Sequence, residues 1–484
     1  MGNQRSTSRR TFLSTAALLA GAAAATSSIW AGVLRRNRQP NIILMMADDL
    51  GYADLSCYGR PDYQTPNIDL LAKQGTRFTQ AYANSAVCSA TRVGLITGRY
   101  QNRLPIGLQE PLGALDKKDL GLPPSHPTLP SLLKKVGYRT ALLGKWHMGK
   151  LPNYGPLKSG YDHFWGFRGG ALDYFSHDAF GEPDLWDDDT PVARAGYLTD
   201  LLGDRAVELV NHYAADAAPF FISLHFNAPH FPWEGPEDVA ESRRLGKISK
   251  PGAIFDADGG TQKTYAAMVT RMDRQVGRVI GALKSQGIAD DTIVIFTSDN
   301  GGERYSDTWP FSGKKTELLE GGLRIPAIIR WPGHIPPNVS NDQVMISMDW
   351  LPTLLAMAGA RTDPDYPPDG IDLTTSLTRG APSRPRTLCW RYLNLSQEAC
   401  RDGDWKYLKI LGNTFLFNLV DDPQERANLK ERLPEIYRRL VADYQKWNQT
   451  MLALDPTAHT NGFSGDQLAD HYGITRPDAT ELTH

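Results

Sequence analysis

Two pairs of oxygen-bearing side chains follow two of the most apolar segments of this 484-residue chain. Asp48-Asp49 comes directly after residues 41–47 (NIILMMA), and Asp299-Asn300 comes shortly after residues 292–297 (TIVIFT). Buried parallel strands consist of continuous apolar runs of this kind, and ligands bind beyond the carboxyl ends of such strands. An all-oxygen pocket suits calcium or magnesium rather than zinc or copper. Each pair alone is equally typical of a turn or a helix cap, so the metal site requires that the two strands be neighbours.

A further candidate for chemistry is the segment Cys88-Ser89-Ala90-Thr91-Arg92, which is followed by residues 93–99 (VGLITGR). A lone cysteine is most often a small buried side chain, and this alternative has to be weighed against a reactive one. The segment resembles the signature of the sulfatase family, Cys-x-Pro/Ala-x-Arg leading into Leu-Thr-Gly-Arg. This resemblance favours the reactive alternative for Cys88.

In the sulfatase family the signature cysteine is oxidised after translation to formylglycine, an aldehyde whose hydrate has two hydroxyls on one carbon. One hydroxyl attacks sulfur to give a covalent sulfate ester, and the other, once deprotonated, expels sulfate and regenerates the aldehyde. A serine would need water to attack sulfur in the second step. The resemblance therefore implies that Cys88 becomes formylglycine, acts as the nucleophile, and provides an oxygen ligand to the metal.

The resemblance extends over nearly the whole chain after the first forty residues. The matching segments, in the family's order, are DDLGY at 48–52, TPNID at 65–69, GTRF at 75–78, GKWHMG at 144–149, APH at 228–230, SDNG at 298–301, GKK at 313–315, EGGLRIP at 320–326 and RDGDWKY at 401–407. So many ordered matches are far more specific than any one motif.

The resemblance implies a role for each charged residue of the candidate site. Lys145 and Lys315 would bind the sulfate oxygens as point charges, and Arg92 would hold the hydrate in place and offset the carboxylates. His147 would be the base that deprotonates the second hydroxyl, a task that suits an ordinary histidine pKa of about 6.5. His230 would contact the leaving oxygen and, with Lys315, protonate the departing alcohol.

The same resemblance implies the ligands of the metal, which we expect to be calcium, with magnesium as the alternative. The expected ligands are Asp48, Asp49, Asp299, Asn300 and an oxygen of modified Cys88. Such a metal would lower the pKa of the hydrate and polarise the sulfate. Lys315 is preferred to its neighbour Lys314 as the sulfate ligand because its spacing to Glu320 follows the family pattern.

Two residues depart from the commonest form of the family signature, since Ala90 stands where proline is usual and Thr91 where serine is usual. The alanine form occurs in bacterial members. Oxidation of Cys88 requires a maturation partner, which is either a formylglycine-generating enzyme or an anaerobic sulfatase-maturing enzyme. Both partners stay open for this variant of the signature.

Composition restricts the possible partners. The chain has 52 basic and 54 acidic side chains and a net charge of −2, so no basic excess indicates binding to nucleic acid. Four cysteines are too few for a disulfide scaffold, although Cys389 and Cys400 are close enough in sequence to pair locally. Nothing in the sequence sets an oligomeric state.

The first 38 residues have the pattern of an export signal. Arg9 and Arg10 precede an alanine-rich apolar run from Phe12 to Ala25, and SRRTFL at 8–13 resembles a twin-arginine signal. The run is short for a membrane span, and an uncleaved anchor is the alternative. We therefore expect a bacterial protein that uses the twin-arginine translocon and is periplasmic or extracellular. Export in the folded state would allow Cys88 to be oxidised in the cytoplasm.

The elements that must position these residues alternate between strands and helices. Strands are expected at 41–47, 138–143, 219–226, 292–297 and 326–330, and helices at 68–74, 92–97, 129–136, 197–214, 264–286 and 349–358. This alternation predicts an α/β domain over 39–385 with a large, mainly parallel sheet flanked by helices, and the resemblance implies an alkaline-phosphatase-like fold. Residues 386–484 are expected to form a smaller α+β domain with an antiparallel sheet, a helix over 434–451 and a polar tail.

The substrate follows from the resemblance, which is greatest to the arylsulfatase and hexosamine-6-sulfatase branch. Sulfated carbohydrates or aryl sulfates are the expected substrates. Several aromatic residues in expected loops could stack on a sugar or simply anchor those loops: Trp165, Phe167, Tyr174, Phe175, Trp186, Phe231 and Trp233. The alternatives are a phosphonate or phosphate ester hydrolase of the same superfamily, and a non-catalytic binder of sulfated glycans with an unmodified Cys88.

Overall fold

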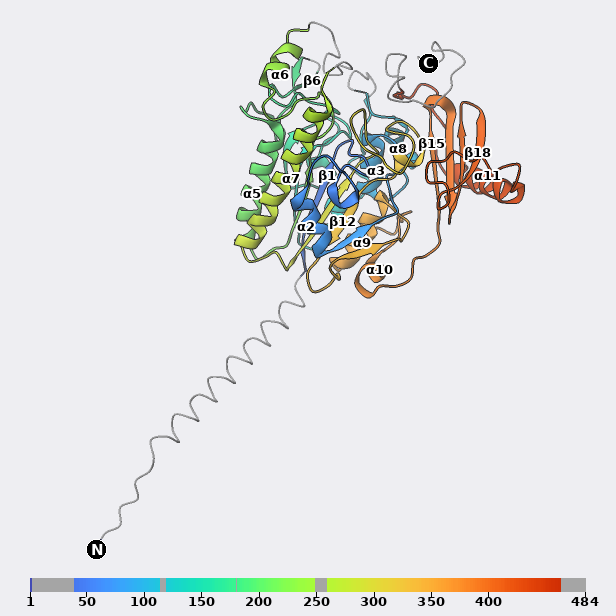
Figure 1. Cartoon of the computed structure of the whole chain (residues 1–484). Coiled ribbons are helices and arrows are strands. Elements are labelled where there is room, and N and C mark those ends of the chain that lie inside the picture. Colours follow the sequence, from blue (N-terminus) through green and yellow to red (C-terminus); the bar gives the residue numbers. More distant parts are fainter. Residues whose placement is uncertain (2–38, 114–118, 180, 249–258, 463–484) are drawn as a thin grey trace.

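The computed structural model describes residue 1 and residues 39–113, 119–179, 181–248 and 259–462. Its largest element is a ten-stranded sheet (Figure 1). Five parallel strands form its centre, in the order β11 (Thr292–Ser298), β1 (Asn41–Ala47), β10 (Phe220–His225), β4 (Arg139–Lys145) and β5 (His163–Phe167). Every residue of β1 is buried, as expected for a strand with helices on both faces.

Shorter strands extend the sheet on both sides. One side has β12 (Ala327–Arg330), β2 (Thr76–Phe78) and β13 (Val339–Asn341), and the other has β8 (Trp186–Asp187) and β9 (Thr190–Pro191). β12 is antiparallel to β11, and β8 is antiparallel to β5. The predicted α/β class with a mainly parallel sheet is therefore confirmed, and the antiparallel strands lie at its edges.

Helices cover both faces of the sheet (Figure 1). One layer has α2 (Pro66–Gln74), α5 (Leu198–Ala214) and α7 (Gln262–Ser285), and the other has α3 (Cys88–Thr97), α4 (Leu129–Lys134), α9 (Trp350–Met357) and α10 (Thr374–Arg379). Successive residues of β1 alternate between the two layers, because Ile43 and Met45 pack with the first and Ile42 and Leu44 with the second.

The antiparallel sheet predicted after residue 386 is also present. It consists of β15 (Thr387–Tyr392), β16 (Gln397–Asp402), β17 (Trp405–Ile410) and β18 (Asn413–Asn418), with α11 (Pro434–Asn448) packed on one face. Cys389 and Cys400 lie opposite each other on β15 and β16 and form a disulfide, which settles the pairing that the sequence left open. The sheet lies against the region of α3 and α8 (Glu320–Leu323) (Figure 1).

The remaining elements are short. They are α6 (Val239–Leu245), the two-residue strands β3 (Ala81–Tyr82), β14 (Met345–Ile346), β6 (Asp178–Ala179) and β7 (Glu182–Pro183), and several 3-10 turns. No helix among the described residues is long and apolar enough to cross a membrane. The predicted export signal over 1–38, except its first residue, and the polar tail from 463 lie outside the described residues.

Candidate active site

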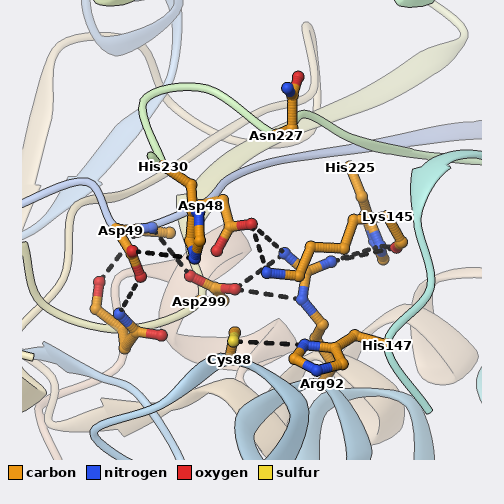
Figure 2. A network of polar contacts seen from close by, with 12 residues as sticks. Asp48, Asp49, Cys88, Arg92, Lys145, His147, His225, Asn227, His230 and Asp299 are labelled. Carbon is orange, nitrogen blue, oxygen red and sulfur yellow. Dashed lines mark hydrogen bonds and ion pairs between the residues drawn. The ribbon is translucent and has the colours of Figure 1, made fainter. Parts of the chain in front are cut away.

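The expected neighbours at the sheet edge are neighbours in the structure. β1 lies between β10 and β11, and the register places Ala47 opposite Ser298 and Met46 opposite His225. Because parallel strands end at the same edge, the residues that follow them meet there. Asp48 and Asp49 therefore lie beside Asp299 and Asn300, as the sequence predicted, and Lys145 at the end of β4 joins them (Figure 2).

The four oxygen-bearing residues form a buried cluster that fits a hard cation. Asn300 Nδ2 donates to Asp49 Oδ1 at 2.8 Å, and the backbone N–H of Asp49 donates to Asp299 Oδ1 at 3.2 Å. Asp48 Oδ1 and Asn300 Oδ1 are buried and have no hydrogen-bond partner among the described residues. Buried oxygens without a partner are costly, and calcium or magnesium would satisfy both.

Burial and the nearby Asp299 carboxylate raise the pKa of Asp48 well above its usual range. A bound divalent cation offsets that repulsion and favours the ionised form. Two groups of three residues each place one possible ligand atom per residue within 4.8 Å of the others. The first group is Asp48, Cys88 and Asp299, and the second is Asp48, Asp49 and His230. The geometry thus brings Cys88 and His230 to the same cluster.

Cys88 is the first residue of α3. This helix therefore begins four residues before the start at Arg92 that the sequence predicted. Its thiol is buried, and this burial raises its pKa, with Lys145 and Lys315 opposing the shift. The helix continues to Thr97, so Arg92 lies one turn after Cys88 and on the same side of the helix. A single rigid element therefore sets both signature residues.

The tautomer of His147 follows from its two contacts. Its Nε2 lies 2.9 Å from the carbonyl oxygen of Leu112, which can accept a hydrogen bond but cannot donate one. Nε2 therefore has the proton, and Nδ1 presents a lone pair 3.4 Å from Cys88 Sγ (Figure 2). Burial and the adjacent Lys145 lower the pKa of His147 well below 6.5, so the ring is neutral at neutral pH. A neutral ring with this orientation is arranged as a base.

Each of two lysines contacts one of the adjacent carboxylates. Lys145 Nζ lies 2.5 Å from Asp48 Oδ2, and Lys315 Nζ lies 2.6 Å from Asp49 Oδ2. Burial acts to lower the pKa of Lys315, but the nearby acidic groups, of which Asp49 has the largest effect, together outweigh burial and raise the pKa, so this lysine stays charged. Its neighbour Lys314 contacts the carbonyl of Arg304 instead. Lys315 is therefore the one of the pair whose ammonium reaches the cluster.

Arg92 is fully buried beneath the cluster. Its Nε and a terminal nitrogen donate to Asp299 Oδ2 at 3.1 and 2.8 Å, and its other terminal nitrogen donates to the carbonyl of Lys145 at 3.2 Å. Although burial acts to raise the pKa of Asp299, Arg92 and Lys145 outweigh it and lower the pKa. Arg92 thus keeps one carboxylate ionised and fixes the backbone next to Lys145.

His230 lies on the loop after β10, above Asp49. Its Nδ1 donates to the carbonyl of Phe231 at 2.6 Å, and its Nε2 is 3.5 Å from Asp49 Oδ2. Burial and the charge of Lys315 lower the pKa of His230 well below 6.5. The neutral ring therefore presents a free Nε2 toward the same space as the ammonium of Lys315.

Sequence reasoning missed three contributors to this site. His225 ends β10, and its Nδ1 lies 3.2 Å from the carbonyl oxygen of Lys145 and 3.3 Å from Arg92, so the ring packs where those two groups meet. Its position at a strand end is the signal that could have identified it. Leu112 supplies the carbonyl that sets the tautomer of His147, and Ser89 holds Leu112 because its Oγ accepts from the Leu112 N–H at 2.8 Å. Backbone contacts of this kind leave no sequence pattern.

The expectation that the aromatic residues lie in loops is wrong for three of them: Trp165 and Phe167 belong to β5 and are buried in the core, and the half-buried Trp186 begins β8. Tyr174 is also buried, and its hydroxyl donates to the carbonyl of His230 at 2.9 Å, so it anchors the His230 loop. Phe231 is half-buried, with its ring 4.0 Å from that of His230 and 5.4 Å from Lys315 Nζ. This ring borders the site.

Comparisons with known proteins agree with this geometry. The sulfatase family model matches residues 40–360. The chain is 33% identical over 375 residues to N-acetylgalactosamine-6-sulfatase of Sus scrofa, which covers 72% of this chain and 68% of that one. It is 33% identical over 407 residues to arylsulfatase A of Homo sapiens, with 76% and 74% covered. The chain spans about two thirds of the length of the first of these relatives.

Solved structures give the same result. The crystal structure of Ps i-CgsB has a TM-score of 0.78 and 30% identity, and the match covers 90% of this chain and 98% of that one. A second structure of that protein, in complex with k-i-k-neocarrahexaose, has a TM-score of 0.77 and 31% identity, with 92% and 100% covered. The likeness therefore includes the C-terminal antiparallel sheet as well as the large sheet.

Proposed function

Because this chain belongs to the sulfatase family of sulfuric ester hydrolases, we propose that it cleaves sulfate monoesters through a formylglycine made from Cys88. The observation that supports this most directly is the direction of the His147 lone pair. Nδ1 faces Cys88 Sγ at 3.4 Å, and the proton on Nε2 is held by the carbonyl of Leu112. A base is thus set beside the side chain that has to lose protons.

Asp48, Asp49, Asp299 and Asn300 would hold the divalent cation, which we propose to be calcium, with magnesium as the alternative. Such a cation supplies charge that lowers the pKa of a nearby hydroxyl and polarises a sulfate oxygen. The unpartnered, buried Asp48 Oδ1 and Asn300 Oδ1 support this assignment. Formylglycine supplies, in its hydrated form, one hydroxyl to attack sulfur and a second whose deprotonation releases sulfate.

The side chains around Cys88 would transfer protons and stabilise the negative charge of the sulfate. His147 takes the proton of the second hydroxyl at Nδ1, because Nε2–H is already bonded. Lys145 and Lys315 are placed to bind sulfate oxygens, whose charge increases as the ester bond breaks. Lys315 and the Nε2 of His230 share the space where the leaving oxygen would lie, so together they are placed to contact that oxygen and to supply the proton to the departing alcohol.

We further propose that the substrate is a sulfated carbohydrate. N-acetylgalactosamine-6-sulfatase of Sus scrofa is named for a sugar sulfate, and Ps i-CgsB binds k-i-k-neocarrahexaose. The half-buried ring of Phe231 next to His230 gives an apolar wall on which the face of a sugar could pack. The fold is shared with a phosphonate monoester hydrolase of Agrobacterium radiobacter, but at 22% identity that likeness concerns the fold alone.

Sulfate release by protein whose Cys88 modification has been verified by peptide mass spectrometry tests the proposal. Sulfated mono- and oligosaccharides and matched aryl sulfate and aryl phosphate esters are the substrates. Cys88→Ala should abolish turnover and leave the fold intact. Cys57→Ala, at the half-buried free thiol outside the site, is the matched control and should keep activity. Undiminished turnover by Cys88→Ala, or an intact thiol in active protein, would contradict the mechanism.

The location in the cell is a separate proposal, which rests on Arg9, Arg10 and the apolar run that follows them. We propose export to the periplasm or beyond through the twin-arginine translocon, after a maturation enzyme has oxidised Cys88. Replacement of Arg9 and Arg10 by lysine should keep active protein in the cytoplasmic fraction. Unchanged export of that variant would contradict the proposal.

A further inference from the structure

The backbone around Lys315 has no helix or strand of its own. It lies between Phe311 and α8, and the residue directly after Lys315 is in an unfavourable conformation, because Thr316 has a φ of +73°. A side chain with a Cβ is disfavoured in the left-handed region and stays there only when surrounding contacts hold it. The direction in which Lys315 leaves the backbone therefore depends on contacts made to Thr316.

A residue of the C-terminal sheet, Gln397, contacts the backbone of Thr316 and of Leu318. Gln397, the first residue of β16, is 1% exposed. Its Nε2 donates to the carbonyl of Thr316 at 2.8 Å and to that of Asn394 at 3.1 Å, and its Oε1 accepts from the N–H of Leu318 at 2.8 Å. One side-chain amide thus holds the backbone on both sides of Glu317, immediately after Lys315.

The C-terminal region also contacts the two ends of the segment that contains Lys315, at Ser312 and at Glu320. The Ser312 hydroxyl donates to the carbonyl of Gln424 at 2.8 Å, and the N–H of Glu320 donates to the Glu425 carboxylate at 2.6 Å. That carboxylate is fixed in turn by the buried Lys406, whose Nζ is 2.8 Å from it. Residues 312–320 are therefore bound to the C-terminal region at both ends.

The large domain binds this segment through backbone contacts on the other side. The N–H of Lys315 donates to the carbonyl of Gly302 at 3.0 Å, and that of Thr316 donates to the carbonyl of Ala86 at 2.9 Å. Ala86 lies two residues before Cys88, so the backbone of Lys315 is fixed between the nucleophile segment and the C-terminal sheet. On the side of the C-terminal sheet, the contacts to this backbone are the hydrogen bonds of Gln397 with Thr316 and Leu318.

We propose that Gln397 is a positioning residue for Lys315, and that the C-terminal sheet thereby completes the sulfate-binding site. The inference rests on the proposed function, since it assigns Gln397 a role through a sulfate-binding lysine. Gln397 does not contact the cluster itself. Its hydrogen bonds to Thr316 and Leu318 keep Thr316 left-handed, and this conformation sets the place from which Lys315 Nζ reaches to 2.6 Å from Asp49.

Gln397→Met tests this, because methionine has a similar volume and cannot make any of these hydrogen bonds. We expect kcat/KM to fall about 10- to 100-fold, the effect of a misplaced catalytic group. Glu398→Gln on the same strand is the matched control, because Glu398 contacts Tyr407 and Lys409 within the C-terminal sheet. The control should keep activity, and thermal unfolding confirms that each variant is folded.

A double-mutant cycle separates positioning from a merely structural role. If Gln397 acts through Lys315, Gln397→Met should cause almost no further loss of kcat/KM in a Lys315→Met background. A loss of the same factor in both backgrounds would overturn the proposal, because general destabilisation does not depend on Lys315. Full activity of Gln397→Met alone would overturn it as well.

Binding of inorganic sulfate, measured by titration calorimetry, separates failure of this proposal from failure of the proposed function. Gln397→Met should weaken sulfate binding about tenfold in the otherwise unchanged protein and have little effect in the Lys315→Met background. This coupling in a protein that hydrolyses no sulfate ester would uphold the positioning role and reject the proposed catalysis. Active protein in which sulfate binding shows no coupling would overturn the positioning role and leave the proposed function standing.

Discussion

At the scale of single residues, the chemistry of the site depends on which nitrogen atoms of His147 and Lys315 are protonated. The carbonyl of Leu112 fixes the proton of His147 on Nε2, and Asp49, with the other acidic groups nearby, keeps the Lys315 ammonium charged. Both effects come from partners within hydrogen-bond distance, and the charged side chains of the site are buried, so each contact has a larger effect than at the surface. Small displacements of a ring or an ammonium should therefore lower activity strongly.

Gly170 offers a direct test of the His147 orientation. A Cβ on Gly170 would lie 2.5 Å from Cε1 and 2.6 Å from Nε2 of His147, so an alanine there has to displace the ring. We expect Gly170→Ala to lower kcat about 10- to 100-fold with little change in Tm, because the ring moves and the core does not. Steady-state kinetics on an aryl sulfate and thermal unfolding measure the two quantities.

The control for this variant is the same substitution at a site with space. Gly281→Ala, on the exposed side of α7, meets nothing within 4 Å and should leave kcat unchanged. A Gly170→Ala protein with full activity would show that His147 can move without loss, and its assignment as the base would then be wrong.

At the scale of elements, the ends of strands and one helix N-terminus position the site. β1, β4, β10 and β11 end at one edge, and α3 begins with Cys88 below it. The helices of the opposite layer have no residue in the cluster, yet they fix the strands by packing. α7 is the longest of them and packs against α2 and α5.

Two glycines of α7 make opposite predictions. Gly281→Ala should stabilise the protein by up to about 1 kcal/mol, because alanine favours a helix and nothing lies close. At Gly277 a Cβ would lie 2.2 Å from Oδ1 of Asn67, whose Nδ2 is held by Asp273 at 2.8 Å. Gly277→Ala should therefore destabilise the protein by about 1–3 kcal/mol through overpacking.

Chemical denaturation of the two variants beside the unchanged protein measures both free energies of unfolding. Equal effects of the two substitutions would show that helix propensity alone decides, and that the contact between α7 and α2 at Asn67 is loose.

At the scale of the whole molecule, the C-terminal region closes the site from one side. In addition to the contacts of Gln397, this region contacts Glu110, whose carboxyl Oε2 accepts from the N–H of Leu393 at 2.6 Å and from the Thr460 hydroxyl at 3.2 Å. Glu110 lies two residues before Leu112, the residue that sets the tautomer of His147. The C-terminal region thus contacts both segments that flank the cluster, one near Lys315 and one near His147.

Glu110 gives a prediction for pH dependence. Burial raises its pKa to about 8, whereas in the unfolded chain it is close to 4.5. Between these values the unfolded chain loses a proton that the folded protein keeps, so stability falls as pH rises through this range and levels off above it. Glu110→Gln should remove most of that fall, which is on the order of a few kcal/mol.

Denaturation at fixed calcium over pH 5 to 9 measures this effect. The same substitution at the exposed Glu435 on α11 is the control and should leave the pH profile unchanged. An identical pH slope in Glu110→Gln and the unchanged protein would show that Glu110 is ionised in the fold.

The sequence by itself determined the class of fold and most of the reactive residues. Continuous apolar runs such as 41–47 and 292–297 predicted the buried strands, because hydrophobic periodicity is a local property. The pairs of oxygen-bearing side chains that follow those runs predicted a metal site. Together with the ordered segments shared with the sulfatase family, they predicted one site made of Asp48, Asp49, Cys88, Asp299 and Asn300. The structure brings these residues together.

Tertiary structure decided what depends on contacts between distant segments. No local pattern shows that Leu112 faces His147, that His225 contacts Arg92 or that Gln397 holds Thr316, since these contacts join residues 35 to 133 positions apart. It also placed Trp165 and Phe167 in the core, because a short apolar stretch is compatible with a loop or a strand until a neighbouring strand pairs with it. Periodicity and motifs report on near neighbours in the chain, and only packing reveals which backbone and side-chain groups meet across it.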